Sequence, residues 1–293
     1  VFGTDVLTCN DNDGEQCDDE GWYWFQSSGK LYTDSSKKKI NGKYYIFNEH
    51  GQMLYEWIDN DTTLKVGSNA QLDGQLASSS YVKPTAKDIL YYNEVDDGSR
   101  GNGWYEIDGA QDMDTDNDTD WYYIDDGEVL FADNANKDYA TVNSDGDMVY
   151  VQRIKVEGKY FSFNEKGQMQ TGLQFCRDAG GFYYFDDNGY QKTGRVSNVE
   201  CDDDDYNFYF NTKNGKNGLG YTGKKDGYLY FNGKRLEADD DYRIYYVNGD
   251  LYLVNTKGKI QNAKSGKDFV VENDTLKDCA TFDDDGEVEV VTT

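Results

Sequence analysis

The fold of this chain is decided by residues 41–53, which read NGKYYIFNEHGQM. The aromatic and β-branched run Tyr44 to Phe47 predicts a strand, and the polar residues Asn48 to Gly51 predict a turn. Residues Gln52 to Leu54 would then run back alongside the first strand, so the stretch is typical of a β-hairpin. A glycine at the end of such a loop supplies the positive φ that the loop commonly needs, and an Asn at its start can bond the turn backbone.

The same template recurs along the chain. An aromatic or β-branched residue is usually followed by Asn or Asp, then by Gly at position +4, and often by an apolar residue at +6. Gly167, Gly189 and Gly258 take the place of Gly51 in later copies. Seven copies begin at Phe25, Phe47, Val142, Phe163, Phe185, Val254 and Phe282, and looser versions begin at Ile124, Phe210 and Phe231.

A single hairpin is at best marginally stable in water, so its aromatic face must be buried against the next hairpin. Repeats of this kind therefore stack. We predict an all-β fold, a solenoid of stacked β-hairpin repeats of about 20 residues with little or no helix. Because Tyr 26 and Phe 14 supply much of the apolar content, the core should be thin and aromatic.

The expected segments follow from where the template holds. Residues 1–20 are an N-terminal cap or the remnant of a preceding repeat, and residues 21–59 are hairpin repeats. Residues 60–87 are polar and Ser-rich and contain the only proline, Pro84, which indicates an enlarged loop or an atypical unit. Residues 88–293 are again hairpin repeats.

Charge and hydropathy exclude two classes of partner. The formal net charge of −27 repels nucleic-acid phosphates and anionic membrane surfaces. No stretch approaches the roughly 18 apolar residues of a membrane span. We therefore expect no nucleic-acid partner and no membrane insertion.

Three runs of the sequence resemble a known family: residues 41–53, residues 157–172 (EGKYFSFNEKGQMQTG) and residues 180–194 (GGFYYFDDNGYQKTG). They resemble the choline-binding, or cell-wall-binding, repeats of Gram-positive surface proteins. They are also similar to the glucan-binding repeats of glucosyltransferases and the repeats of large clostridial toxins. The resemblance covers most of the chain from about Gly21 onward. It implies a β-solenoid of hairpins that is extracellular or on the cell surface, has no catalysis of its own, and binds its ligand multivalently.

In that family a Gly-Trp pair precedes the hairpin, a Trp or Tyr opens its strand, and choline lies between neighbouring hairpins in an aromatic cage. The strand-opening position is aromatic in six units of this chain: Trp22, Tyr44, Trp104, Trp121, Tyr160 and Phe182. The Gly-Trp position departs from the pattern. It holds Trp57 once, and otherwise Ser35, Gln152, Leu173, Arg195 and Lys264, with Gly220-Tyr221 near the same register. Most cages would therefore lack one wall.

Two cages are the candidate ligand sites. The first combines Trp57 with Tyr44 and with Trp104 or Tyr91, and the second combines Tyr221 with Tyr209 and Tyr230; Trp22 and Trp121 are further candidates. The alternative is that these rings form the core between hairpins. Choline would bind through cation–π contacts, whereas a glycan would stack on a ring and bond to Asn, Asp and Gln side chains. Both ligands stay open.

Metal and catalytic chemistry have little support. The run beginning at Asp112 does not match an EF-hand loop, because Asn117 and Tyr123 occupy the positions where Gly and Glu are required. A weak calcium site is the remaining candidate, against a solvated loop, and its ligands would be Asp112, Asp114, Asp116 and Asp118. We expect no other cofactor. With a single histidine, His50, and no GxSxG or HExxH motif, we expect no enzyme.

Two functions follow from this pattern. The first is a cell-wall- or carbohydrate-binding module of a secreted bacterial surface protein, with sites for choline or glycan between its hairpins. The second is a structural stalk or adhesin that has lost its ligand sites and binds a protein partner or associates end to end. Open grooves beside the aromatic residues would favour the first function, and complete burial of the rings would favour the second.

Overall fold

The structure, a computed structural model, describes residues 21–34, 36–48, 51–59, 85–110, 119–133, 140–142, 148–201, 204–213, 217–262, 269–271 and 287–288. The chain forms two compact units, Val1–Asp133 with Phe163–Met169, and Asn134–Ser162 with Gln170–Thr293. The predicted cap, residues 60–84 of the predicted loop, His50, the four calcium-candidate aspartates and the copy at Phe282 lie outside the described residues. The predicted segment boundaries stay predictions.

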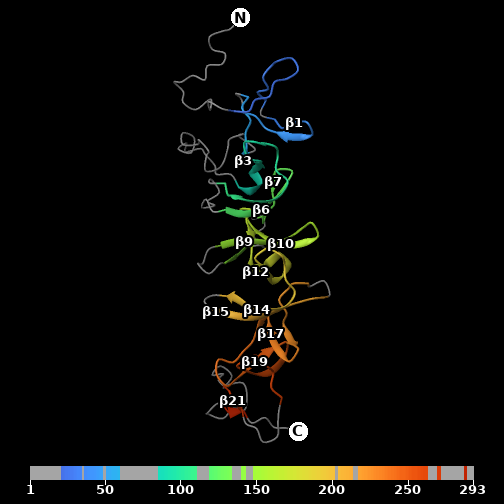
Figure 1. Cartoon of the computed structure of the whole chain (residues 1–293). Coiled ribbons are helices and arrows are strands. Elements are labelled where there is room, and N and C mark those ends of the chain that lie inside the picture. The colour runs from blue at the N-terminus through green and yellow to red at the C-terminus, as the bar shows by residue number, and fades with distance from the viewer. Residues whose placement is uncertain are drawn as a thin grey trace. The chain divides into compact units, whose positions relative to one another are not determined.

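The first unit contains two small sheets (Figure 1). Strands β1 (Lys38–Ile40) and β2 (Lys43–Tyr45) form an antiparallel pair. The other sheet has the order β3-β4-β7-β6-β5, with a 3₁₀ turn, η1 (Ala86–Asp88), before β4. Its strands are β3 (Glu56–Asp59), β4 (Ile89–Tyr92), β5 (Gly103–Asp108), β6 (Thr119–Asp125) and β7 (Glu128–Val129).

The remaining described strands form further short sheets. A four-stranded sheet of order β11-β10-β9-β8 contains β8 (Ala140–Val142), β9 (Met148–Val156), β10 (Lys159–Asn164) and β11 (Met169–Gln170). A five-stranded sheet of order β14-β15-β18-β17-β16 contains β14 (Gly194–Cys201), β15 (Asp204–Phe210), β16 (Gly223–Lys225), β17 (Tyr228–Phe231) and β18 (Lys234–Arg235). The two-stranded sheets are β12 (Gly172–Cys176) with β13 (Gly181–Phe185), β19 (Tyr242–Val247) with β20 (Asp250–Asn255), and β21 (Phe269–Val270) with β22 (Glu287–Val288).

The all-β class is confirmed. Among the described residues, the helical segments are two three-residue 3₁₀ turns, η1 and η4 (Arg177–Ala179). The sheets are small, and most of their pairs join strands consecutive in the chain, as expected for hairpin repeats; β4 with β7 and β15 with β18 are the exceptions among the described strands. The stacking of every repeat into one solenoid stays a prediction.

The turns of the repeat form as the sequence predicts. Gly51, Gly167, Gly189 and Gly258 have φ values of 82°, 85°, 75° and 70°. In each turn the side-chain oxygen of the leading Asn or Asp accepts a hydrogen bond of 2.9–3.0 Å from the backbone N–H four residues later. At Gly51 space is a second constraint, because a Cβ would lie 2.9 Å from the carbonyl oxygen of Tyr32. Glycine is therefore required there for both conformation and room.

The predicted pairing across these turns forms and is short: β10 pairs with β11 across the turn at Gly167, and Phe185 bridges Gln191 across the turn at Gly189. Residues Gln52–Leu54 pair with the preceding strand only through isolated bridges, such as that between Phe47 and Met53. Strand β2 itself forms its ladder with β1, the strand before it. The β1–β2 pair is joined by a second kind of turn, in which two consecutive residues have positive φ and form the hairpin connection that best matches strand twist. Among the described residues, six such turns occur, at Asn41-Gly42, Asp126-Gly127, Glu157-Gly158, Asp226-Gly227, Asn232-Gly233 and Asn248-Gly249.

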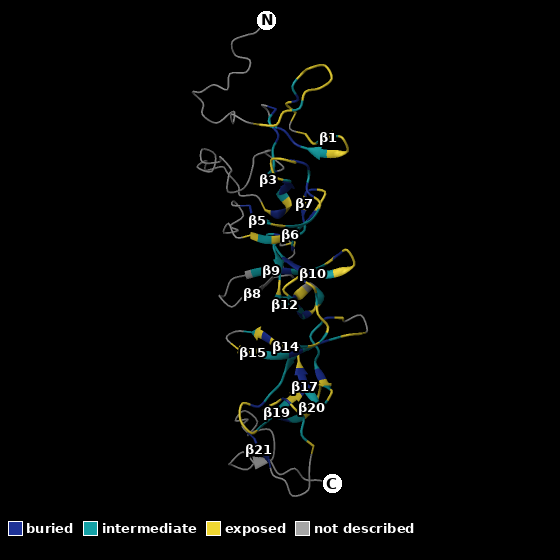
Figure 2. Ribbon diagram, in the orientation of Figure 1, coloured by how far each residue is buried: buried dark blue, intermediate teal, exposed yellow. Residues whose placement is uncertain are grey.

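The core consists of short buried stretches within the strands (Figure 2). Aromatic side chains are prominent in it, as predicted, and they are seven of the eleven largest fully buried side chains. The largest fully buried side chains are Tyr92, Tyr122, Tyr230, Phe163, Phe185, Phe210 and Phe269, together with Ile58, Ile89, Ile124 and Leu229.

Candidate functional site

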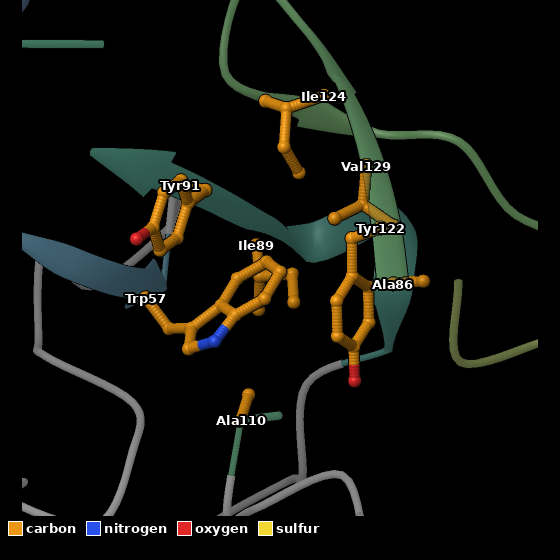
Figure 3. Packing of buried hydrophobic residues seen from close by; sticks show 8 residues of the cluster. All are labelled: Trp57, Ala86, Ile89, Tyr91, Ala110, Tyr122, Ile124 and Val129. Atoms are coloured by element: carbon orange, nitrogen blue, oxygen red, sulfur yellow. The ribbon is translucent and has the colours of Figure 1, made fainter. Parts of the chain in front are cut away.

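Trp57, the central residue of the first predicted cage, lies in the core of the first unit (Figure 3). Its side chain is 3% exposed, and its ring centroid lies 4.9 Å from that of Tyr91 and 5.3 Å from that of Tyr122. The indole N–H donates a 2.8 Å hydrogen bond to the carbonyl oxygen of Asp108. Trp57 and Tyr91 are opposite each other in the β3–β4 ladder, which brings both rings to the buried face. They therefore lie where the core alternative places them, and neither ring presents an open face to a ligand.

The other candidates of the first unit are less buried. The ammonium groups of Lys37 and Lys39 lie 4.3 Å and 5.2 Å from the ring centroid of Tyr44, which is half-buried. Trp104 is half-buried and stacks on Phe163 with a centroid distance of 5.9 Å. Trp22 and Trp121 are exposed, at 57% and 41%. A ligand role for these four residues stays a prediction.

The second predicted set comes together in the structure. The ring centroid of Tyr209 lies 5.7 Å from those of both Tyr221 and Tyr230, and the centroids of Tyr221 and Tyr230 are 6.4 Å apart. Tyr209 is in β15, Tyr230 is in β17, and Tyr221 precedes β16. Tyr230 is 1% exposed, and this burial raises the pKa of its hydroxyl above the usual range. Tyr230 is thus the buried base of the cluster, while Tyr209 and Tyr221 are half-buried.

A cavity of about 390 Å³ lies beside Tyr221. Its aromatic wall is formed by Tyr221 and by Phe182, which occupies the strand-opening position of its repeat. Apart from the aliphatic Leu219, the remaining lining residues are small or polar: Gly180, Gly181, Asn211, Gly220, Thr222, Asn232 and Asn248. A ring at the strand-opening position and a ring near the Gly-Trp register therefore meet at one cavity.

Backbone hydrogen bonds place Tyr221 at the cavity. The N–H of Gly220 donates to the carbonyl oxygen of Phe182 at 2.8 Å, and the N–H of Tyr221 donates to that of Tyr209 at 2.9 Å. Gly220 passes so close to the turn at Asn232 that a Cβ on it would lie 2.5 Å from the Asn232 carbonyl oxygen. The absence of a side chain at residue 220 thus allows β13 and the Asn232-Gly233 turn to approach each other around Tyr221.

The polar lining is hydrogen-bonded and neutral. The side-chain amide of Asn248 donates to the carbonyl oxygen of Thr222 at 3.3 Å, and that of Asn211 donates to the carbonyl oxygen of Leu219 at 2.7 Å. Thr222 Oγ1 accepts a 2.9 Å bond from the backbone N–H of Asn232. Each primary amide has two donor hydrogens and an acceptor oxygen, so these bonds leave further capacity for a ligand. The ten lining residues, all of them described, include no charged side chain.

Other rings of the second unit are occupied by the chain's own cations. The guanidinium carbon atoms of Arg195 and Arg235 lie 5.6 Å and 5.2 Å from the ring centroid of Tyr228. Arg195 stands at the Gly-Trp position of its repeat. The ammonium of Lys159 lies 4.0 Å from the ring centroid of Tyr190. At these two rings the cation is therefore supplied by the chain itself.

No three His, Cys, Asp or Glu side chains of the described ranges lie close enough together to hold a metal ion. No helix in the described part of the chain has the length and apolar composition needed to cross a bilayer.

No protein-family model matches the sequence, and no curated protein sequence matches it. Solved structures do match. Choline-binding protein F from Streptococcus pneumoniae, in the presence of a peptidoglycan analogue, is 22% identical over 86% of this chain and 73% of its own, with a TM-score of 0.44. CbpF in complex with ipratropium gives 22% identity, 86% of this chain, 74% of its own and a TM-score of 0.45.

The chain is similar to choline-binding repeat proteins of known structure. Alternansucrase in complex with isomaltononaose also matches, at 17% identity over 87% of this chain and 16% of the enzyme, with a TM-score of 0.26. The absence of catalysis in this chain stays a prediction.

Several cavity residues were not among the sequence-predicted ligand residues. Phe182 was placed in the repeat register but not in a cage, and Thr222, Asn232 and Asn248 were not singled out. The signal for two of them was local, since Asn232 and Asn248 each precede a glycine in a two-residue hairpin turn. That Asn-Gly pattern predicts the turn but does not indicate which cavity the amide reaches.

Proposed function

We propose that this chain is a non-catalytic carbohydrate-binding module of an extracellular or cell-surface protein, and that the cavity beside Tyr221 binds a saccharide unit. The observation that carries the proposal is the combination of two aromatic walls with neutral amide and hydroxyl groups in one cavity. Saccharide sites need a flat ring for the apolar face of the sugar and precisely placed polar groups for its hydroxyls. Phe182 and Tyr221 supply the first requirement, and Asn211, Asn232 and Asn248 supply the second.

The choice of a neutral glycan over choline rests on charge. A quaternary ammonium ion is best held by several ring faces or by a carboxylate, whereas this cavity has two aromatic side chains and no acidic group among its lining residues. Its amides suit hydroxyl groups, which donate and accept hydrogen bonds. If similar weak sites recur in other repeats, a polymeric glycan would engage several at once and gain affinity through multivalency.

Substitution of Tyr221 by alanine is expected to weaken saccharide binding about tenfold, equivalent to about 1.4 kcal/mol, because the sugar loses the ring on which it stacks. Binding of soluble isomaltooligosaccharides and of purified cell-wall fragments is measured by isothermal titration calorimetry. Tyr246→Ala is the matched control, since Tyr246 is 69% exposed and does not line the cavity. Equal saccharide affinities of the two variants would show that the cavity is not the binding site. Failure of the parent protein to bind any glycan or choline would instead favour the stalk or adhesin function.

Asn248→Asp separates the two ligand classes. Asn248 lines the cavity with φ of 53°, a conformation that Asp also tolerates. The new carboxylate is expected to raise affinity for choline about fivefold through Coulomb attraction, and to lower affinity for a neutral glycan because a hydrogen-bond donor is lost.

Asn198→Asp is the control for this change, because Asn198 has a similar φ of 55° but does not line the cavity. Both variants are titrated by nuclear magnetic resonance with choline and with the oligosaccharide. A rise in glycan affinity for Asn248→Asp, or equal choline affinities for the two variants, would contradict the proposed site.

A further inference from the structure

Arg153 lies over two tyrosine rings in the second unit. Its guanidinium carbon is 3.4 Å from the ring centroid of Tyr160 and 4.8 Å from that of Tyr183. Arg153 is in β9, and the two rings are in β10 and β13. Strands β9 and β10 belong to one sheet and β13 to another, so the Arg153 side chain contacts rings from both sheets. Two ring faces on a single cation are the arrangement by which proteins bind ammonium ligands.

A neighbouring glutamine holds the guanidinium in place. Arg153 Nε donates a hydrogen bond to the side-chain oxygen of Gln191. Gln191 is itself oriented, because its backbone N–H donates to the carbonyl oxygen of Tyr160 at 3.2 Å and its side-chain amide donates to that of Asn217 at 3.2 Å. The Tyr183 hydroxyl donates to the carbonyl oxygen of Ala179 at 3.0 Å. The rings and the bonding partner of the cation are therefore positioned by the fold.

We propose that Arg153 is the built-in occupant of an alkylammonium site. Its guanidinium fills the space over Tyr160 and Tyr183 that a small quaternary ammonium ion would otherwise take, so Arg153 decides that this pair of sheets does not bind such an ion. A tethered cation occupies the site at high effective concentration without losing translational freedom, so a free ion must compete with it at a disadvantage. The site is separate from the cavity at Tyr221, and the inference does not depend on the proposed glycan function.

The occupant matters because of the charge of the whole chain. With a net charge of −27, the protein raises the local concentration of small cations near its surface. An unoccupied pair of tyrosine faces would then collect organic cations. The Arg153 guanidinium covers both tyrosine faces. It also links the sheet that contains β9 and β10 to strand β13.

The test compares Arg153→Ala with the parent protein, using tetramethylammonium chloride as the probe and sodium chloride at equal ionic strength as the reference. We expect the variant to bind the probe saturably, with shifts of the Tyr160 and Tyr183 ring resonances and a rise in Tm. The parent protein should need a concentration at least about tenfold higher to show the same shifts. Adding Tyr160→Leu to the alanine variant should abolish the binding.

Lys155→Ala is the matched control. Lys155 lies two residues away on the same strand, and its ammonium is 5.8 Å from the Tyr160 centroid, so its loss changes net charge equally but leaves Arg153 over the rings. Should Arg153→Ala fail to fold, Arg153→Thr replaces it, because threonine suits a strand. Equal affinity of the parent and a folded Arg153 variant for the probe, or no saturable binding by that variant, would overturn the proposal.

Discussion

Replacement of Trp57 by alanine is expected to lower the free energy of unfolding by about 3–5 kcal/mol, the usual cost of truncating a buried tryptophan. The ring is 3% exposed and packs on Tyr91 and Tyr122, and its N–H bonds to the Asp108 carbonyl oxygen. Truncation would leave a cavity in the core of the first unit and an acceptor without its donor. Urea unfolding followed by circular dichroism measures the change.

Trp22→Ala is the control for this prediction, since Trp22 is 57% exposed and surface substitutions usually change stability by no more than about 0.5 kcal/mol. Trp57→Phe should fall between the two because it keeps a ring in the core. If Trp57→Ala kept the stability of the parent and lost only ligand binding, the side chain would be a ligand contact. If Trp57→Ala lost both binding and stability, the loss of binding would be a consequence of the damaged core.

Phe210→Ala should cause a loss of similar size, about 3–5 kcal/mol, in the second unit. Phe210 is fully buried, and its ring stacks on that of Phe208 at a centroid distance of 5.8 Å with planes 7° apart. Its backbone also bridges to Gly220, which precedes the cavity residue Tyr221. We therefore expect the substitution to weaken glycan binding as well, through displacement of Tyr221.

Phe231→Ala is the comparison, because Phe231 is 51% exposed on β17 of the same sheet. Phe210→Leu should recover much of both the stability and the binding, since it refills most of the volume. Calorimetric unfolding and oligosaccharide titration on the same samples check both effects. A Phe210→Ala protein with the unfolding temperature of Phe231→Ala would show that the ring is not part of the core.

The candidate sites show how far neighbouring residues in the chain determine a role. Tyr221 lies near the Gly-Trp register and is predicted to form a cage with Tyr209 and Tyr230, and the structure brings the three rings together. Trp57 matched the same family pattern better, yet its ring is enclosed by Tyr91 and Tyr122. The register predicts which residues occupy equivalent positions, but the exposure of each ring depends on what the next strands place over it.

The all-β class, the aromatic core and the turns with their positive-φ glycines can be predicted from the local sequence, because they depend on residues within one repeat. Three features become visible in the folded chain alone: Trp57 is a core residue, Phe182 and Tyr221 share a cavity, and Arg153 lies over Tyr160 and Tyr183. Each of these contacts joins residues from different strands that no local pattern relates. Burial and cation placement follow from packing across strands, which the spacing of a repeat does not encode.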